Sequence, residues 1–346
     1  MPTTAGASTP PDVGSRSIRE ARPTDASARA YIVVLLVVGA CAAVYSLRAY
    51  GIFACGAQGY GADGYLAYCQ APNYGDYDHG AFWFGYEPDA IDAASGAQVL
   101  FLGNSRLQIG LSSQALADWF KASGLSYYLM GFAYDANHTF EGPLVERLRP
   151  RATAYVVNLD LFFESETEPI KAVLHDPEAP ARYNRKRLWQ RVHKSLCTSL
   201  AAVCGNAASF SRSRQTGSWV VNGDPGFPNA PVAYDDTVDA GVVEKYVPLG
   251  HAFLARLGVP RACVILTTVP TRESHIGTAR AVASGLGLPL VAPQLEGLNT
   301  FDQSHLDRPS AERWSSAFLD AAGARIRDCV AARTAAGETR RVADRL

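Results

Sequence analysis

Short apolar runs and amphipathic stretches alternate along most of the chain. The apolar runs lie at 98–102, 126–130, 154–160, 263–269 and 288–292. Near-continuous apolar runs of this length are typical of strands buried on both faces of a parallel sheet. The stretches between and after them have the apolar spacing of helices, near 112–122, 140–148, 243–257, 276–286 and 309–333. This alternation predicts a layered α/β fold around a parallel sheet of five strands.

Two segments interrupt this pattern. Residues 51–96 are rich in Gly and Tyr, and residues 165–240 are polar. The rings of the first segment either pack as a linker or lid or stack against sugar rings, and we favour packing. The second segment is too long for a simple connection, so we predict an insertion over the active face of a domain spanning 97–334, with 335–346 as a tail. Its basic stretch "RYNRKRLWQRVHK" indicates a solvated helix surface, with an anionic glycan or phospholipid headgroups as the alternative contact.

The amino-terminal region has a different pattern. Residues 1–29 are rich in Pro, Ser, Thr, Ala and Gly, which is typical of a disordered tail. Ala30–Leu47 is an uncharged run of eighteen residues bracketed by Arg29 and Arg48. As a helix it would be about 27 Å long, enough for the hydrocarbon core of a bilayer. We therefore predict a transmembrane helix over 30–50, with a buried core helix as the alternative.

The charges around this run predict its orientation. Arginines precede the run. After Arg48, which ends it, several acidic residues come before the next Lys or Arg. The positive-inside rule then places residues 1–29 in the cytoplasm and the main domain outside it. We expect a single-pass protein of a bacterial inner membrane with a periplasmic or extracellular domain. The letters "VGAC" ending at Cys41 resemble a lipoprotein cleavage box, but the apolar run continues past Cys41, which favours an uncleaved anchor.

Composition narrows the function classes. The chain has 346 residues, 48% of them apolar, and a formal net charge of −1. This neutral balance argues against a nucleic-acid-binding protein. No clustered pattern of His, Asp and Cys has the spacing of metal ligands, so we expect neither a metal nor a cofactor.

Six of the seven cysteines lie outside the apolar run, an even number that fits disulfides in an oxidising compartment. Proximity in the sequence favours the pairs Cys55–Cys69 and Cys197–Cys204, which leaves Cys263 with Cys329. Fifteen pairings of six cysteines are possible. Six unconnected buried thiols are the alternative.

Two polar motifs follow predicted strands. In "VLFLGNSRLQIGLSS" an apolar run leads through Gly103 to Ser105, at the strand end where open α/β sheets bind ligands. In "FDQSHLDRPSAERWSSAFLD" Asp302 and His305 stand three residues apart before the last predicted helix. A serine nucleophile needs a base to take its proton, and the imidazole needs a carboxylate that fixes its tautomer. We predict a Ser105, His305 and Asp302 triad; the alternative is that Ser105 is an ordinary turn residue.

The order of these motifs resembles the SGNH/GDSL hydrolase superfamily. "FLGNSR" is similar to that family's first block, with Gly-Asn-Ser in place of Gly-Asp-Ser, and "FDQSHL" is similar to the last block, which supplies Asp and His. The resemblance covers residues 98–160 and 262–320. It implies a flavodoxin-like three-layer sandwich and a serine-dependent ester hydrolase or O-acyltransferase without a cofactor.

The same resemblance implies an oxyanion hole formed by the amides of Ser105 and of Gly131 in "YYLMGFAYD". The family's third block, Gly-x-Asn-Asp, is replaced here by "VVNLDLFFES", which leaves Asn158 as the expected but open third donor. Further side chains near these motifs are expected to bind substrate, and they are Arg106, Arg272 and His275. A structural role for Arg106 is equally expected, and His138 is expected at the surface.

One amino-terminal anchor followed by an exported SGNH-like domain resembles proteins of alginate and peptidoglycan O-acetylation, and the D-alanine transfer protein of teichoic acid synthesis. By this analogy the chain is an O-acyltransferase or acetylesterase on a cell-surface polysaccharide, with a membrane-bound O-acyltransferase as a partner that supplies the acyl group. The alternative is a non-catalytic glycan-binding or assembly protein that keeps the fold. The aromatic stretch at 51–90 and the altered third block favour that alternative.

Overall fold

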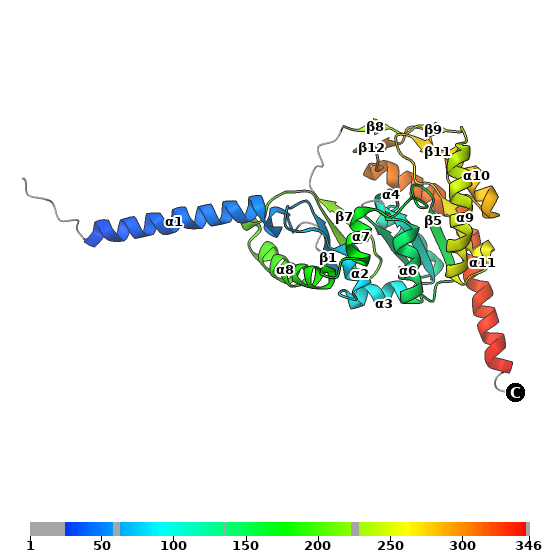
Figure 1. Ribbon diagram of the computed structural model, residues 1–346, viewed down its shortest axis with the longest axis horizontal. Coiled ribbons are helices and arrows are strands. Elements are labelled where there is room, and N and C mark those ends of the chain that lie inside the picture. Colours follow the sequence, from blue (N-terminus) through cyan, green and yellow to red (C-terminus); the bar gives the residue numbers. More distant parts are fainter. Residues whose placement is uncertain (1–24, 58–62, 134–135, 223–227, 344–346) are drawn as a thin grey trace, which may run out of the picture. The chain divides into compact units, whose positions relative to one another are not determined.

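The computed structural model describes residues 25–57, 63–133, 136–222 and 228–343 (Figure 1). The chain forms two compact units, Met1–Tyr45 and Ser46–Leu346. The tail predicted for residues 1–29 lies outside the described residues as far as position 24. From there on, helix α1 (Asp25–Tyr50) begins.

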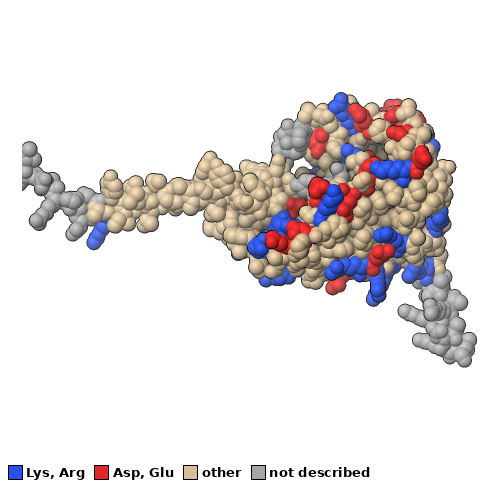
Figure 2. Space-filling view, viewed as in Figure 1, with Lys and Arg blue, Asp and Glu red and all other residues tan. Residues whose placement is uncertain are grey.

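Helix α1 carries the uncharged run found in the sequence. Its segment Ala28–Tyr50 is long and apolar enough to cross a membrane, and its apolar side chains are exposed rather than packed in a core. Figure 2 shows an uncharged surface along most of this helix. Because such a large apolar surface is unfavourable in water, the helix is compatible with a single-pass anchor.

Four buried parallel strands form the central sheet of the larger unit. They are β3 (Val99–Asn104), β4 (Tyr127–Phe132), β5 (Ala154–Asn158) and β10 (Val264–Thr267), in the spatial order β10-β5-β3-β4. Counted along the chain, this is the 2-1-3-4 order with which flavodoxin-like sheets begin. The prediction of an α/β chain with a parallel sheet is therefore confirmed.

The fifth strand predicted over 288–292 does not form. Leu290 makes a single parallel bridge to Leu266, whose backbone N–H donates to Pro289 and whose carbonyl accepts from Val291. Pro289 has no N–H to donate, so the ladder cannot extend at that position. Among the residues that the structure describes, the parallel sheet thus has four strands and one bridge at its edge.

Helices cover both faces of this sheet. On one face, Leu100 and Leu102 share an apolar core with α6 (His138–Leu148), α9 (Ala240–Leu257) and α10 (Ile276–Leu286). On the other face, Phe101 shares a core with α5 (Ser113–Ser123) and α11 (Arg308–Ala343). Successive residues of β3 enter different cores because side chains alternate along a strand. The result is a three-layer arrangement, with helices on both sides of the sheet (Figure 1). Helix α11 extends into the predicted tail, of which 344–346 lie outside the described residues.

A second, antiparallel sheet joins the two segments that interrupt the sequence pattern, and the pattern does not predict it. Its strands, in the order β2-β1-β6-β7, are β1 (Gly64–Cys69), β2 (Gly75–Asp76), β6 (Ser209–Ser213) and β7 (Trp219–Asn222). Gly64 pairs with Ser213 at one end of the β1–β6 ladder. The rings of Tyr65, Tyr74 and Tyr77 are buried around it, so these aromatic residues pack rather than offer their faces to a ligand.

Shorter elements complete the larger unit. The helices are α2 (Asp78–Trp83), α3 (Pro88–Gly96), α4 (Ser105–Gly110), α7 (Glu168–Leu174), α8 (Ala179–Ser199) and the 3-10 turns η1 (Ile52–Ala54), η2 (Ala201–Val203) and η3 (Arg261–Cys263). The strands are β8 (Ala230–Pro231), β9 (Tyr234–Asp235), β11 (Ser274–His275) and β12 (Asn299–Thr300). β8 pairs with β12, so the end of the predicted insertion lies beside the segment that leads to Asp302.

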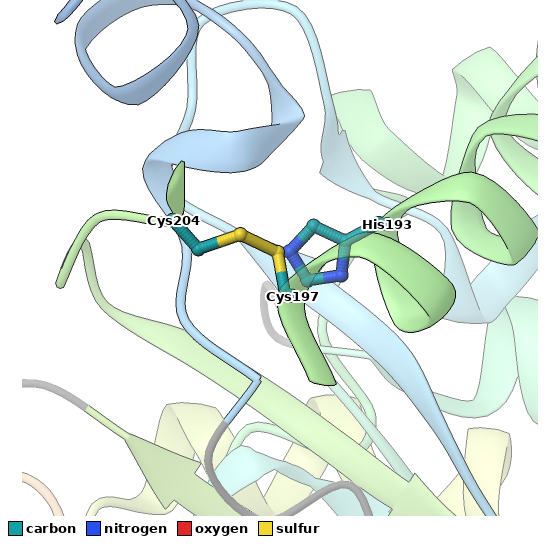
Figure 3. Close-up of side chains that lie close together, drawn as sticks. All are labelled: His193, Cys197 and Cys204. Carbon is teal, nitrogen blue, oxygen red and sulfur yellow. A yellow bond between two sulfur atoms is a disulfide. The ribbon is translucent and has the colours of Figure 1, made fainter. Parts of the chain in front are cut away.

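Both disulfides favoured by sequence proximity, Cys55–Cys69 and Cys197–Cys204, are present, and so is the remaining pair Cys263–Cys329. Cys41, in α1, is a free and exposed thiol. Figure 3 shows the Cys197–Cys204 bond beside His193. The bridges tie the second sheet to η1, the end of α8 to η2, and η3 to α11.

Candidate active site

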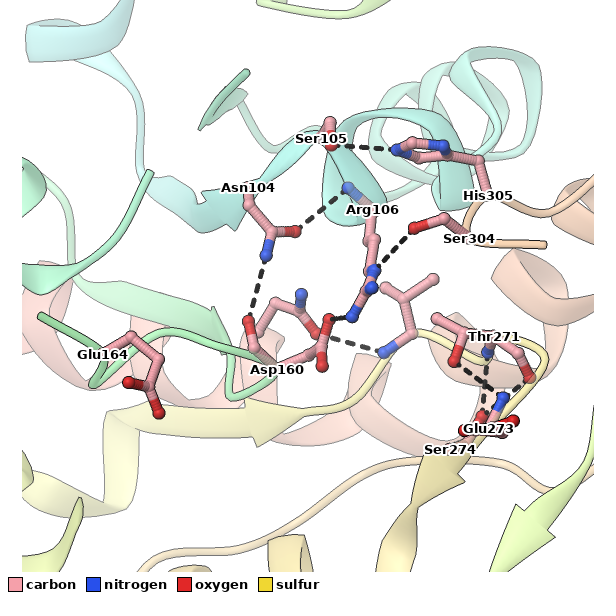
Figure 4. A network of polar contacts seen from close by, with 12 residues as sticks. Asn104, Ser105, Arg106, Asp160, Glu164, Thr271, Glu273, Ser274, Ser304 and His305 are labelled. Carbon is pink, nitrogen blue, oxygen red and sulfur yellow. Dashed lines mark hydrogen bonds and ion pairs between the residues drawn. The ribbon is translucent and has the colours of Figure 1, made fainter. Parts of the chain in front are cut away.

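Ser105 is the first residue of α4 and directly follows β3 (Figure 4). Asn104 caps this helix, because its Oδ1 accepts a hydrogen bond of 3.0 Å from the backbone N–H of Arg106. Gly103 has a φ of +153°, and a Cβ at that position would lie 2.9 Å from Cβ of Asn158. The turn therefore requires glycine there. It places the Ser105 hydroxyl at the carboxyl end of the parallel sheet.

His305 contacts both other members of the predicted triad. Its Nε2 lies 2.9 Å from Oγ of Ser105, and its Nδ1 lies 2.6 Å from Oδ2 of Asp302. The loop between β12 and α11 holds this geometry, since the backbone N–H groups of Ser304 and His305 donate to Oδ1 of Asp302 at 3.0 and 2.7 Å. Gln303 turns this loop with a φ of +68°. One chain of hydrogen bonds thus joins the serine, the imidazole and the carboxylate.

The carboxylate of Asp302 is shielded and remains charged. Burial by itself raises the pKa of Asp302, but hydrogen bonds from the His305 ring and from the backbone N–H groups of His305 and Ser304 outweigh it and lower that pKa. The side chains of Asp302 and His305 are only 12% and 15% exposed. A carboxylate held against Nδ1 keeps the proton of a neutral imidazole on that nitrogen, which leaves Nε2 to accept one from the serine.

Arg106 belongs to a network beneath the serine rather than to an open binding surface (Figure 4). Its guanidinium pairs with the carboxylate of Asp160, and its Nε donates to Oγ of Ser304 at 2.9 Å. Asn104 donates to the carbonyl of Asp160 at 3.0 Å. The network therefore ties the end of β5 to the turn at Gly103–Ser105 (the predicted nucleophile turn) and to the Asp302 loop, which is a structural role for Arg106.

The other two residues expected to bind substrate lie outside the triad. Arg272 donates to Oε1 of Gln303 at 2.6 Å and so contacts the outside of the Asp302 loop. His275 is exposed, and its Nδ1 lies 3.4 Å from Oδ2 of Asp235, away from the triad contacts. His138 begins α6, and its Nδ1 lies 3.0 Å from the carbonyl of Phe162. None of the three makes a described contact with Ser105 or His305.

Gly131 is packed directly against the nucleophile turn. It pairs in register with Gly103, and a Cβ on it would lie 2.9 Å from the carbonyl oxygen of Asn104 and 2.8 Å from Cγ of Gln108. No side chain fits at this position. The close approach gives a physical reason for glycine here and brings the end of β4 beside the residue that precedes Ser105.

Asn158 carries a buried donor that lacks a partner among the described residues. Its Oδ1 accepts a hydrogen bond of 3.1 Å from the backbone N–H of Val269, which fixes the orientation of the amide. Its Nδ2 is buried and makes no hydrogen bond. Buried donors are nearly always satisfied, so an unsatisfied one beside the nucleophile turn requires an explanation. A negatively charged oxygen of a bound intermediate would satisfy it.

Three buried side chains that the sequence analysis did not single out support the turn. Oε1 of Glu141 accepts a hydrogen bond of 2.9 Å from the backbone N–H of Gly103. Gln108 donates to the carbonyl of Gly131 at 2.7 Å, and the Arg212 guanidinium donates to the same carbonyl. The sequence could have indicated that Glu141 is buried, because it lies on the same helical face of α6 as the apolar residues Leu144 and Val145. Arg212 has no comparable signal, since its partners lie far away in the sequence.

A cavity of about 210 Å³ opens next to this network. Asp160, the partner of Arg106, and Val269, the partner of Asn158, both line it. Its remaining walls combine apolar side chains and hydroxyl groups with Glu164, Asp239 and His275, and no triad residue lines it. The cavity is large enough for a short acyl group or part of a sugar ring and small compared with typical cofactor sites.

Among the described residues, one group of side chains has the spacing of metal ligands, and it comprises His193, Cys197 and Cys204. Both sulfur atoms are joined in a disulfide, and Nε2 of His193 lies 2.9 Å from the carbonyl of Cys55 (Figure 3). Metal binding by cysteine requires thiolates, which a closed disulfide does not offer. The group is therefore a structural bridge in this state.

No family model, no curated protein and no solved structure matches this chain.

Proposed function

We propose that this chain is a membrane-anchored, exported serine acyl enzyme of the SGNH type, an O-acyltransferase or acetylesterase that acts on a polysaccharide. The observation that carries the proposal is the hydrogen-bonded series from Ser105 through His305 to Asp302, with distances of 2.9 and 2.6 Å. Serine, imidazole and carboxylate in this order can activate a hydroxyl as a nucleophile. The 2-1-3-4 strand order and the position of Ser105 after the first strand support the SGNH comparison.

The first half of the reaction forms an acyl-enzyme. Oγ of Ser105 attacks the carbonyl carbon of an ester while Nε2 of His305 takes the hydroxyl proton. The negative charge moves to the carbonyl oxygen, where the backbone N–H groups of Ser105 and Gly131 and Nδ2 of Asn158 would stabilise it. When the intermediate collapses, the ester C–O bond breaks and His305 returns the proton to the departing alcohol. Asp302 stabilises the imidazolium throughout.

The second half transfers the acyl group from Ser105 to an acceptor. His305 takes a proton from water or from a sugar hydroxyl, whose oxygen attacks the acyl carbonyl. Collapse of the second intermediate restores the Ser105 hydroxyl with the proton from His305. Water as the acceptor makes the protein an esterase, and a sugar hydroxyl makes it a transferase. A membrane-bound O-acyltransferase would supply the acyl group in the second case.

The aromatic argument for the non-catalytic alternative is weakened for part of the 51–90 stretch. A glycan-binding protein needs aromatic faces at the surface, whereas Tyr65, Tyr74 and Tyr77 are buried in the second sheet. The altered third block still contributes Asn158, whose unsatisfied buried amide would have a use in the enzyme as an oxyanion donor.

The test is hydrolysis of a small chromogenic acetate ester by the purified full-length chain. Ser105→Ala is expected to abolish the activity and to remove the acyl adduct found on the enzyme by mass spectrometry. Ser316→Ala, which removes an exposed hydroxyl on α11, is the matched control and should keep the activity. Equal turnover by wild type and Ser105→Ala would refute the catalytic proposal.

The proposed topology has its own test. With the span inserted as the positive-inside rule predicts, alkaline phosphatase fused to the carboxyl terminus is active and a cytosolic fluorescent reporter fused there is dark. An inactive phosphatase together with a bright cytosolic reporter would contradict the topology without bearing on the triad.

A further inference from the structure

Helix α8 concentrates positive charge in a chain that is nearly neutral as a whole. It carries six basic side chains and no acidic one, whereas the chain has a formal net charge of −1. Its outward face also exposes Leu188, Trp189 and Val192, each by about half of its surface. These side chains lie at helical spacing, one turn after the exposed Arg185. Large apolar residues beside basic ones are the pattern of a helix that lies in a membrane interface.

α8 lies beside the point where the apolar run of α1 ends. The Trp189 ring contacts the edge of the Phe53 ring, with 6.0 Å between centroids. Arg48, the first charged residue after the run, donates to the carbonyl of Ala202 just beyond the end of α8 at 3.2 Å. Arg48 lies at the end of the apolar run and Phe53 follows it within a few residues, so insertion of that run would bring these two contacts of α8 near the bilayer surface.

A cavity of about 690 Å³ opens between α8 and this junction. Arg182, Arg185 and Lys186 line it together with Leu47 and aromatic rings, and none of the lining residues is acidic. Arg182 already pairs with Asp176, at 2.5 Å. Arg185 has no acidic partner among the residues that the structure describes.

Lys186 is the most deeply placed of the three cations. Its ammonium donates to the backbone carbonyl of Asp76, and it lies 4.9 Å from the centre of the Tyr183 ring. Burial lowers the pKa of Lys186 to about 8, an effect that the nearby Asp76 carboxylate only partly offsets. An anion in the cavity would stabilise the charged form of Lys186 and could also pair with the guanidinium of Arg185.

We propose that this cavity binds the phosphate headgroup of an anionic phospholipid, with Leu188, Trp189 and Val192 inserted in the membrane interface beside it. The inference rests on the proposed membrane topology and is independent of the triad chemistry. Apolar insertion and phosphate binding act on the same helix, so they would hold the domain against the membrane surface rather than leave it tethered by the anchor alone.

The first experiment measures the depth of Trp189. The full-length chain is reconstituted in vesicles of phosphatidylcholine and phosphatidylglycerol, with acyl-chain-brominated lipids as the quencher of tryptophan fluorescence. Trp189→Phe keeps an aromatic ring against Phe53 and reports the background from the other four tryptophans. We expect the wild type to lose a quenchable component that Trp189→Phe lacks. Identical quenching of both proteins would overturn the proposal.

The second experiment tests the headgroup. Native mass spectrometry of the full-length chain in detergent, titrated with phosphatidylglycerol or phosphatidylcholine, should show tighter binding of the anionic lipid. Arg185→Gln should weaken that binding about fivefold. Lys121→Gln, the same loss of charge at an exposed cation on α5, should leave it unchanged. Equal binding of both lipids, or equal loss in the two variants, would overturn the headgroup assignment.

A wild-type chain that fails to float with vesicles would instead refute the topology. Ester hydrolysis by that same chain would still report on the triad.

Discussion

Oε1 of Glu141 accepts a hydrogen bond of 2.9 Å from the backbone N–H of Gly103, two residues before Ser105. Burial raises the pKa of Glu141 well above its ordinary value, although this hydrogen bond and the charge of Arg212 act against the rise. Burial therefore favours the neutral form of the carboxyl group, which contacts the turn that leads to Ser105. One variant of Glu141 keeps the hydrogen-bond acceptor and another removes it.

Glu141→Gln keeps a neutral acceptor for the Gly103 N–H, and we expect it to keep turnover near the wild-type level. Glu141→Leu leaves that N–H unsatisfied, at a cost of about 1–3 kcal/mol in the free energy of unfolding. We also expect a fall in kcat for ester hydrolysis, with less change in KM, because the serine is displaced. Denaturant unfolding and steady-state kinetics measure the two effects. A Leu variant with lowered stability and unchanged kcat would show that Glu141 supports the core alone.

The raised pKa of Glu141 also predicts how stability depends on pH. Above pH 4.5 the unfolded chain releases the proton of Glu141 while the folded chain retains it. The unfolded state then binds fewer protons, so the contribution of Glu141 to stability falls as the pH rises toward the folded-state pKa. Glu141→Gln lacks this loss. The stability of the Gln variant relative to wild type should increase with pH above 4.5, measured by unfolding at a series of pH values; a constant difference would contradict the assignment.

The lowered pKa of Asp302 bears on the pH dependence of activity. Since the pKa of Asp302 is lowered, its titration lies in the acid range and cannot limit activity near neutrality. Activity should instead require the His305 ring in its neutral form, since only that form can accept the proton of Ser105. Asp302→Asn should keep the fold and lose most of the activity. The corresponding change in serine proteases lowers kcat by about 10⁴-fold.

The combined triad variants provide the control for that experiment. Ser105→Ala, His305→Ala and the double variant should all have about the same residual rate, because the residues act as one unit. Additive losses, measured as kcat under saturating ester, would mean that the serine and the histidine act separately.

Asn158→Ala tests the unsatisfied amide. If Nδ2 stabilises the oxyanion, its removal should lower kcat by about 10² to 10³ while KM changes little. Thr267→Val is the matched control, since Thr267 pairs with Asn158 in the neighbouring strand. The variant lacks the hydrogen bond of 2.7 Å that the Thr267 hydroxyl donates to the carbonyl of Val291. That control should lose stability and keep turnover. Similar kcat values for the two variants would assign the third oxyanion donor elsewhere.

The three disulfides should contribute unequally to stability. Cys263–Cys329 closes a loop of 66 residues and Cys197–Cys204 one of 7. In the chain-entropy description the longer loop constrains the unfolded state by about 2 kcal/mol more. Replacing both cysteines of each pair by serine and measuring denaturant unfolding checks this difference. In the unreduced, denatured wild type, a thiol reagent should label Cys41 alone, and labelling of seven thiols would contradict all three bridges.

The parts of the fold that sequence patterns predicted are those determined locally. The runs that became β3, β4, β5 and β10 are apolar on both faces, and that property is visible in a window of a few residues. The fifth run failed because Pro289 interrupts the ladder, a constraint that outweighs its apolar character. The contact of Ser105 with His305 was predictable because chain order and strand ends together limit where the two motifs can meet.

The second sheet and the buried charges depend on partners remote in the sequence. Arg212 is fully buried, and it is tolerated there because Asp78 and the carbonyls of β4 accept its hydrogen bonds. Nothing near Arg212 in the sequence indicates those partners. An arginine is ordinarily expected at the solvent-exposed surface, and the burial of Arg212 is visible only in the assembled fold.

The pairing of β1 with β6 has a consequence for biosynthesis. Arg214, next to the end of β6, bonds to the carbonyl of Gly64, 150 residues earlier in the chain. When β1 emerges from the ribosome, its partner strand has not been made, so its backbone edge stays open while most of the domain is still being synthesised. A long delay between the two strands leaves time for wrong pairings before β6 arrives.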